Sequence, residues 1–248
     1  MSSPPPSIFA AAATAYRDVA EALVAMRGLA VVTGFIILAA ELLNWALNRW
    51  VIPADSLLGR DIMPVVITFL VTPFLIAVHR HVLLREITPT YELKPSERRF
   101  QLFFGWSMVF FVLGEIPQVL AVLVAPGSNL AFSVVLLVLL IALTVLSVRT
   151  VILFPAIAVD APGATWQNAV RDTSGHGWAI FFLFLAILIP FVAVAMIVIV
   201  AALSLPGGLL LLVPLECVGM IVSLGALVAA ASRLYERLGD RVNRPPPA

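Results

Sequence analysis

Three carboxylates, Glu41, Glu115 and Glu216, lie inside stretches of sequence that are otherwise almost entirely apolar. Asn44 and Gln118 each follow an acid by three residues, a spacing that places the amide and the carboxylate on one face of a helix. One interpretation is a polar site that holds a proton, a cation or the amine of a lipid-like ligand. The other is structural, because acids and amides also hydrogen-bond one membrane helix to the next, usually for about 0.6 kcal/mol per contact. The residue types leave both interpretations open.

The composition around these acids predicts that lipid is the solvent. Of the 248 residues 62% are hydrophobic and only 12% are charged, and the mean hydropathy is +1.08. A soluble domain carries about 25% charged residues, so this chain could not cover a water-facing surface with polar groups. Nucleic-acid binding is not expected, because no basic face is large enough. The single cysteine, Cys217, excludes an internal disulfide.

Six segments are long and apolar enough to cross about 30 Å of hydrocarbon as helices. They are residues 28–50, 62–79, 101–124, 129–149, 178–202 and 207–232. The expected fold is therefore all-α, a polytopic bundle of six transmembrane helices over residues 28–238. Residues 1–27 form a cytoplasmic or interfacial segment before it, and residues 239–248 form a cytoplasmic tail after it.

Charge predicts the orientation of this bundle. Thirteen of the 15 Lys and Arg residues fall on the side of the N-terminus, and only Arg49 and Arg60 fall on the other. The positive-inside rule then places both termini in the cytoplasm. The expected location is the cell (inner) membrane, which the chain crosses several times. Small residues at fourfold spacing, Gly219 with Ser223 and Gly225 with Ala229, give the last span a surface for close packing.

The segment before the first span is predicted to be an amphipathic helix over residues 7–27. Its apolar residues recur at spacings of three and four: Phe9, Ala12, Tyr16, Val19 and Leu23. Thr14, Arg17, Asp18 and Glu21 lie largely on other faces. Such a helix either lies along the inner interface, against lipid or the bundle, or extends the first span into the cytoplasm.

The first cytoplasmic loop, residues 79–100, alternates both signs of charge and is expected to be a solvated connector. His79 and His81 invite a metal interpretation, but residues two apart on a helix point away from each other. A zinc site also needs four partners, and only Glu86 and the distant His176 are candidates. No metal site and no cofactor is predicted.

The second cytoplasmic loop contains more structure. Residues 154–159 are apolar but too few to cross, residues 160–163 form a turn, and residues 165–173 form a short amphipathic helix capped by Thr165. A segment of this shape is expected to dip into the inner interface. Arg149 and Arg171 are expected near lipid phosphate or near Asp160 and Asp172.

The same loop carries a resemblance. The residues that carry it are Arg149, Phe154-Pro155-Ala156, Ala158-Val159, Ala169, Arg171-Asp172-Thr173 and Trp178, with the ending Leu234-Tyr235-Glu236-Arg237-Leu238. This pattern resembles that of small bacterial six-helix membrane proteins known as YciC-like, and of the membrane domain found in glycerophosphodiester phosphodiesterases. The resemblance implies an interfacial segment built on Arg149, Pro155, Asp160, Arg171 and Asp172. It implies no phosphodiesterase activity, because catalysis in the fused proteins belongs to a separate soluble barrel.

The depths of the three acids predict that they converge. At 1.5 Å per residue, each lies about 20–24 Å from the cytoplasmic edge of its span. Three costly groups at one level can share a pocket only if the first, third and sixth spans are neighbours. Asn44 and Gln118 would then face the same space.

These observations favour a non-enzymatic integral membrane protein that interacts with membrane lipids, in envelope or lipid organisation; protein partners are not indicated. The alternative is a small transporter or a proton- or cation-coupled permease that uses Glu41, Glu115 and Glu216. An enzyme is not expected, because no span carries a Ser–His, Cys–His or metal-ligand constellation.

Overall fold

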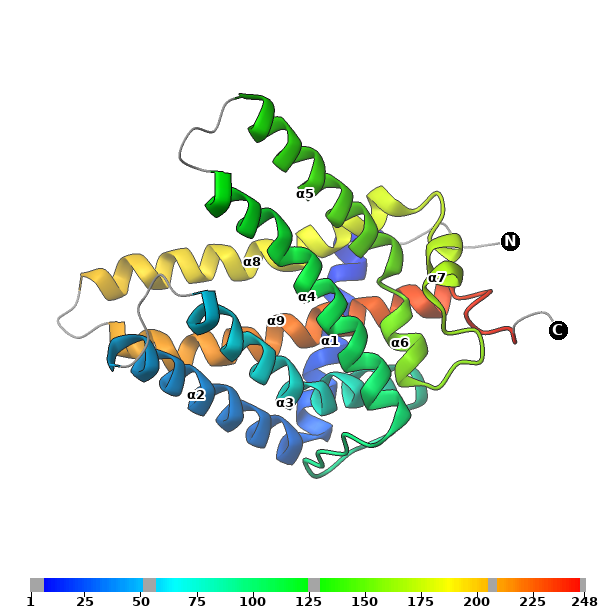
Figure 1. Cartoon of the computed structure of the whole chain (residues 1–248). Helices are drawn as coiled ribbons and strands as arrows, with labels where there is room; N and C mark the ends of the chain where they lie inside the picture. Colours follow the sequence, from blue (N-terminus) through cyan, green and yellow to red (C-terminus); the bar gives the residue numbers. More distant parts are fainter. Residues whose placement is uncertain (1–6, 51–56, 125–129, 205–208, 246–248) are drawn as a thin grey trace.

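The computed structural model describes residues 7–50, 57–124, 130–204 and 209–245, and within them the chain is entirely helical and loop (Figure 1). The helices are α1 (Ile8–Ala25), α2 (Arg27–Trp50), α3 (Leu57–Leu84), α4 (Arg98–Val124), α5 (Leu130–Thr150), α6 (Leu153–Ala158), α7 (Trp166–Asp172), α8 (Gly177–Leu203) and α9 (Leu209–Leu238). The all-α prediction is confirmed.

Six of the described helices, α2, α3, α4, α5, α8 and α9, are long and apolar enough to cross a membrane, which confirms the six predicted spans. Two of them are longer than predicted by more than one turn at the end that bears the termini. Helix α3 continues to Leu84 rather than residue 79, and α9 continues to Leu238 rather than residue 232. Charged side chains occur in both extensions, and tertiary contacts keep these turns helical where hydropathy alone ends the span.

Helix α1 belongs to the core of the bundle. It lies behind the other helices in the view of Figure 1 and packs chiefly against α9 and α8. The expected apolar face is only partly right. Ala12 and Val19 are buried as predicted, but Phe9 is 79% exposed and Asp18 is only 2% exposed.

The contact between α1 and α9 depends on small residues of the last span. A Cβ at Gly225 would lie 2.3 Å from Cγ2 of Val19, so only glycine allows this approach. Ala229, one turn further on, is fully buried in the same cluster. The predicted packing surface is confirmed for this pair, whereas a Cβ at Gly219 would meet no atom within 4 Å. The small residues therefore allow close helix packing in the half of α9 that contacts α1.

Helices α4 and α5 join the bundle less closely. Helix α4 packs mainly on α3, α5 and α6, and α5 packs mainly on α4, α7 and α8. Figure 1 shows the two helices diverging from α8 towards the end of the bundle away from the N- and C-termini. The first half of α5 carries many exposed apolar side chains, among them Val134, Val135 and Val138. Such a surface suits contact with lipid chains.

The segment between α5 and α8 folds into two short helices, of which α7 is the helix predicted over residues 165–173 and α6 was not predicted. Residues 153–158 form α6, and Oγ1 of Thr165 accepts a hydrogen bond from the backbone N–H of Asn168 to cap α7. The chain after α9 returns to this segment, and Gly163 donates its N–H to the carbonyl of Val242 at 3.0 Å. A Cβ at Gly163 would lie 2.4 Å from the carbonyl oxygens of Arg241 and Arg244, so glycine is required here. The predicted tail is thus packed on the α6–α7 loop over its described residues.

Candidate functional site: a cavity between the third, fourth and fifth spans

The three acids predicted to share a pocket lie on α2, α4 and α9. Helices α2 and α9 are packed together, which brings the elements that carry Glu41 and Glu216 side by side. Helix α4, which carries Glu115, packs chiefly on α3, α5 and α6 instead. The prediction that the three spans are neighbours therefore holds for α2 and α9 but not for α4. Similar depth in the membrane does not specify which helices pack together.

The structure describes side-chain contacts for two of the three acids and for both amides. Nε2 of Gln118 donates a hydrogen bond to Oε1 of Glu115 at 3.4 Å, so this pair shares a helix face as predicted. Glu41 and Asn44 also have interaction partners. The side chain of Glu216 lies outside the described part of the structure, and a shared site for the three acids stays a prediction.

The residues of the family-like motif hold the short helices to the bundle. Nη1 of Arg149 donates to the carbonyl of Thr173 at 3.3 Å, and Oγ1 of Thr173 donates to the carbonyl of Arg149 at 2.7 Å. This reciprocal pair fixes the end of α5 to the end of α7. Pro155 is buried within α6, whereas Arg171 is exposed.

The two acids of the motif have partners that the sequence did not indicate. Asp160, whose backbone is left-handed with a φ of 53°, lies 3.9 Å from Nη1 of Arg80 and 3.6 Å from Nη2 of Arg99. Oδ2 of Asp172 accepts the backbone N–H groups of Arg241 and Val242 at 2.8 and 3.1 Å. Among the described residues neither acid forms an ion pair with Arg149 or Arg171, and the alternative expectation, that these arginines lie near lipid phosphate, stays a prediction.

Arg80 is the centre of a polar cluster at this end of the bundle. Its Nε donates to Oε2 of Glu86 at 2.9 Å, and its Nη1 donates to the carbonyl of Ala158 at 3.0 Å. A small recess of about 260 Å³ lies beside it, under the loop that follows α3. The charges around the recess already pair with one another, for example Lys94 with Glu92 and Glu97. We assign this cluster a structural role.

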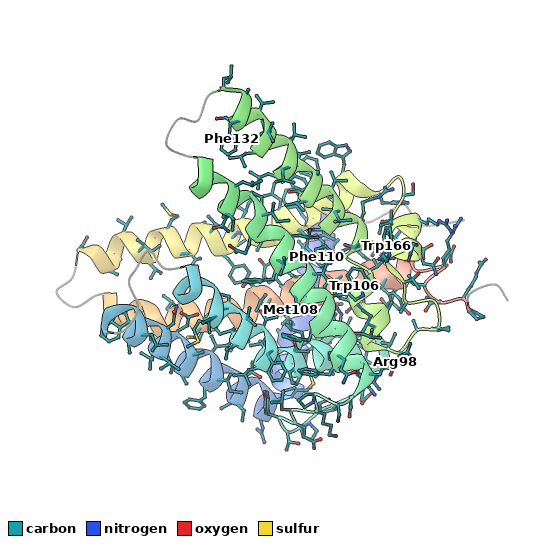
Figure 2. All side chains as sticks on the ribbon, viewed as in Figure 1. Arg98, Trp106, Met108, Phe110, Phe132 and Trp166 are labelled. Carbon is teal, nitrogen blue, oxygen red and sulfur yellow. The ribbon has the colours of Figure 1, made fainter. Side chains whose placement is uncertain are left out.

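A larger cavity, of about 670 Å³, opens between the α4–α5 hairpin and α8. Side chains from α3, α4, α5, α6, α8 and α9 line it, and most of them are Leu, Val or Phe. Phe154 of α6 forms part of its wall and contacts Phe103 and Phe110 of α4, with ring centroids 5.0 and 5.9 Å apart. Figure 2 shows Trp106 and Phe110 along the same helix. Ligand sites typically measure about 300–1,000 Å³, are mostly apolar and carry a few polar groups, so this cavity is the candidate site.

Four polar side chains line the cavity: His79, Ser107, Thr144 and Ser147. His79 is only 1% exposed, and its Nδ1 lies 2.8 Å from Oγ of Ser232 on α9. The hydroxyls of Ser107, Thr144 and Ser147 each donate to the carbonyl four residues earlier, at 2.8 to 2.9 Å. None of the described residues that line the cavity is charged.

The sequence did not identify this site, because His79 was expected in a solvated loop. That expectation is wrong: His79 and His81 are both buried on the last turns of α3. Their rings point to different partners, Ser232 for His79 and the carbonyl of Glu86 for His81. One signal was present in the sequence, since the apolar run of the second span resumes after these histidines at residues 82–84.

No group of three or more His, Cys, Asp or Glu side chains suited to a metal ion lies together within the described ranges.

Searches against protein-family models, curated proteins and solved structures found no match to this chain. The class of protein therefore follows from the fold itself. With six apolar helices of spanning length and an all-α architecture, the chain is a multi-pass membrane protein.

Proposed function

We propose that the protein is a non-enzymatic lipid-binding protein of the cell inner membrane, and that the cavity between the α4–α5 hairpin and α8 takes a lipid chain from the bilayer. One observation carries the proposal: a cavity of about 670 Å³ with an almost wholly apolar lining lies among helices that cross the membrane. A cavity lined in this way favours hydrocarbon over water, because water needs two to four polar partners. This role agrees with the interaction with membrane lipids that the sequence analysis favours.

The depth of the cavity fits this role. Its lining includes residues within two turns of the inner ends of α3 and α4, His79 and Phe103, and reaches Gly114 further along α4. It therefore extends over about 16 Å, the rise of the 11 residues between Phe103 and Gly114. An acyl chain that enters beside α5 would lie along the membrane normal, as it does in the bilayer.

Lipid retention tests the proposal. Thr144→Trp fills the cavity from α5, and Val145→Trp, on the next residue, is the matched control because Val145 is exposed and does not line the cavity. After extraction and exchange into detergent, native mass spectrometry should find bound lipid on the wild type and on Val145→Trp, and much less on Thr144→Trp. Equal lipid on both tryptophan variants would contradict the proposal.

We also propose that both termini are cytoplasmic. The support is the excess of Lys and Arg on the side of the termini. In a Cys217→Ala background, a cysteine at Ser204 should react with an impermeant thiol reagent added to intact cells, and a cysteine at Ser174 should not. Both positions are exposed, so accessibility is matched. Labelling at Ser174 with protection at Ser204 would reverse the orientation.

A permease that uses the three acids is the second proposal. The packing of α2 on α9 supports part of it, and the separate position of α4 does not. Replacement of Glu41, Glu115 or Glu216 by Gln would abolish proton- or cation-coupled transport, but would leave a structural hydrogen bond in place.

A further inference from the structure

The polar side chains of the cavity share one property: each already donates its proton in a hydrogen bond within the protein. Oγ of Ser232 donates to the carbonyl of Val228 at 3.0 Å, so the hydroxyl proton is committed to α9. On this ground we assign the proton of His79 to Nδ1, which then donates it to Oγ of Ser232. In this tautomer the neutral imidazole of His79 has an unprotonated Nε2, which is a hydrogen-bond acceptor.

The three hydroxyls on the cavity wall lead to the same result. Ser107, Thr144 and Ser147 each spend the single hydroxyl proton on a carbonyl of their own helix. What remains on each oxygen is lone-pair capacity. The described lining therefore offers acceptors from four side chains and a free donor from none of them.

The lining also selects against charge. None of its described residues is Asp, Glu, Lys or Arg, and an ion moved into an apolar site without a partner is strongly disfavoured. A phosphate would meet lone pairs instead of donors, and an ammonium would meet no carboxylate. The ligand that matches this lining is uncharged, apolar over most of its length and carries a hydrogen-bond donor at one end.

We infer that the cavity binds a neutral lipid alcohol, such as a long-chain alcohol or a diacylglycerol, with its hydroxyl donated to Nε2 of His79. This inference rests on the proposed lipid-binding function and adds the class of lipid. His79 lies on the last turns of α3, near the end of the bundle that carries the termini. The hydroxyl end of the lipid would lie there, and its chain would extend along α4 and α5.

Photo-crosslinking in lipid vesicles tests the inference. The probes are a long-chain alcohol with a diazirine in mid-chain and its methyl ether, which has the same chain but cannot donate a hydrogen bond. A diacylglycerol with the same diazirine chain distinguishes a single-chain from a two-chain lipid. We expect the alcohol to label peptides of residues 140–151 and 181–188 about fivefold more than the ether, the order of one net hydrogen bond.

Three variants assign the preference to His79. His79→Phe keeps an aromatic ring against Phe103 and removes both nitrogens, while Ser232 keeps its bond to Val228. The alcohol and the ether should label this variant equally. Ser232→Ala releases the Nδ1 proton from its partner and should reduce the preference. Ser204→Ala is the control: it removes a serine that also donates to a carbonyl of its own helix but lies far from His79. It should leave the preference for the alcohol unchanged.

The outcomes separate the two proposals. Equal labelling of the wild type by alcohol and ether would overturn the inference and leave lipid binding standing. Absence of labelling of the cavity peptides by any probe would overturn lipid binding itself. A preference that survives in a folded His79→Phe protein, judged by its elution and thermal unfolding in detergent, would remove His79 from the site.

Discussion

Where α1 meets α9, the two helices approach so closely that a single methyl group at Gly225 would overlap Val19. Where α5 meets α8, the helices leave a cavity of about 670 Å³. Both regions are built from apolar residues, and they differ in the sizes of the side chains at the contact. Glycine and alanine on α9 let backbones pack closely, whereas Leu and Phe on α4, α5 and α8 keep the helices apart.

Polar groups are used differently in the two regions. At α1, Asp18 is buried and both its oxygens accept from Arg233 of α9, at 2.7 and 2.9 Å. In the cavity, the polar groups bond within their own helices or to one neighbour and keep lone pairs free. The first arrangement stabilises a fixed contact, and the second leaves capacity for a ligand. Changes at α1 should therefore act on stability, and changes in the cavity should act on binding.

The largest effect on stability is expected at the Asp18–Arg233 pair. Asp18→Ala would leave the guanidinium of Arg233 without its bidentate partner, at a cost of about 3 kcal/mol in the free energy of unfolding. Glu21→Ala, one turn further along α1, removes an exposed carboxylate that pairs with the exposed side chains of Arg17 and Arg85. It should have little effect on the free energy of unfolding. Unfolding in mixed micelles measures both. Similar losses for the two variants would show that the buried pair does not hold α1.

The Gly225 contact should show the next effect. Gly225→Ala places a methyl group against Val19, a stiff β-branched side chain, and should cost about 2 kcal/mol through overpacking. Gly219→Ala is the matched control on the same helix, since its Cβ would meet no atom within 4 Å. The same unfolding assay applies. If the two glycines tolerate alanine equally well, α1 is not held by close packing.

A smaller effect is expected from pH. Burial raises the pKa of Tyr16 above its usual value of about 10, and the Tyr16 hydroxyl donates to the carbonyl of Ile187 on α8 at 2.6 Å. Because the folded state holds this proton more tightly than the unfolded chain does, its contribution is complete below pH 10. It is lost as pH rises through the folded pKa.

Thermal unfolding between pH 8 and 11 checks this dependence. Tyr16→Phe should be less stable than the wild type at pH 8 and should lose less stability on going to pH 11. Burial also raises the pKa of Tyr91, which donates to the carbonyl of Leu70, and Tyr91 and Tyr235 both contribute to the dependence that remains. An unchanged pH profile in Tyr16→Phe would show that the bond to α8 does not contribute.

Much of the fold could be predicted from the sequence because hydropathy and charge act along the chain. Six spans, the short helix over residues 165–173 and its Thr165 cap all follow from local patterns, and the structure has them. Helix ends were less predictable. The last turns of α3 are charged, and they stay helical because Arg80 and His81 find partners in the loop that follows.

The burial of Asp18 could not be predicted, because on its own helix it belongs to the polar face. Its partner Arg233 lies 215 residues away. The partners of Asp160 and Asp172 are likewise set by contacts between distant segments. Long-range pairing leaves no periodic trace in one sequence.

The sequence by itself determined that the chain needs lipid as its solvent, how many helices cross it and which small residues allow a close approach. The tertiary structure alone decided which helices are neighbours, and hence that α4 packs chiefly on α3, α5 and α6. It also decided that His79 faces a cavity with Ser232 behind it. The physical reason is that hydropathy specifies a helix's environment, whereas the choice of neighbours depends on the shapes of side chains that meet only in the folded bundle.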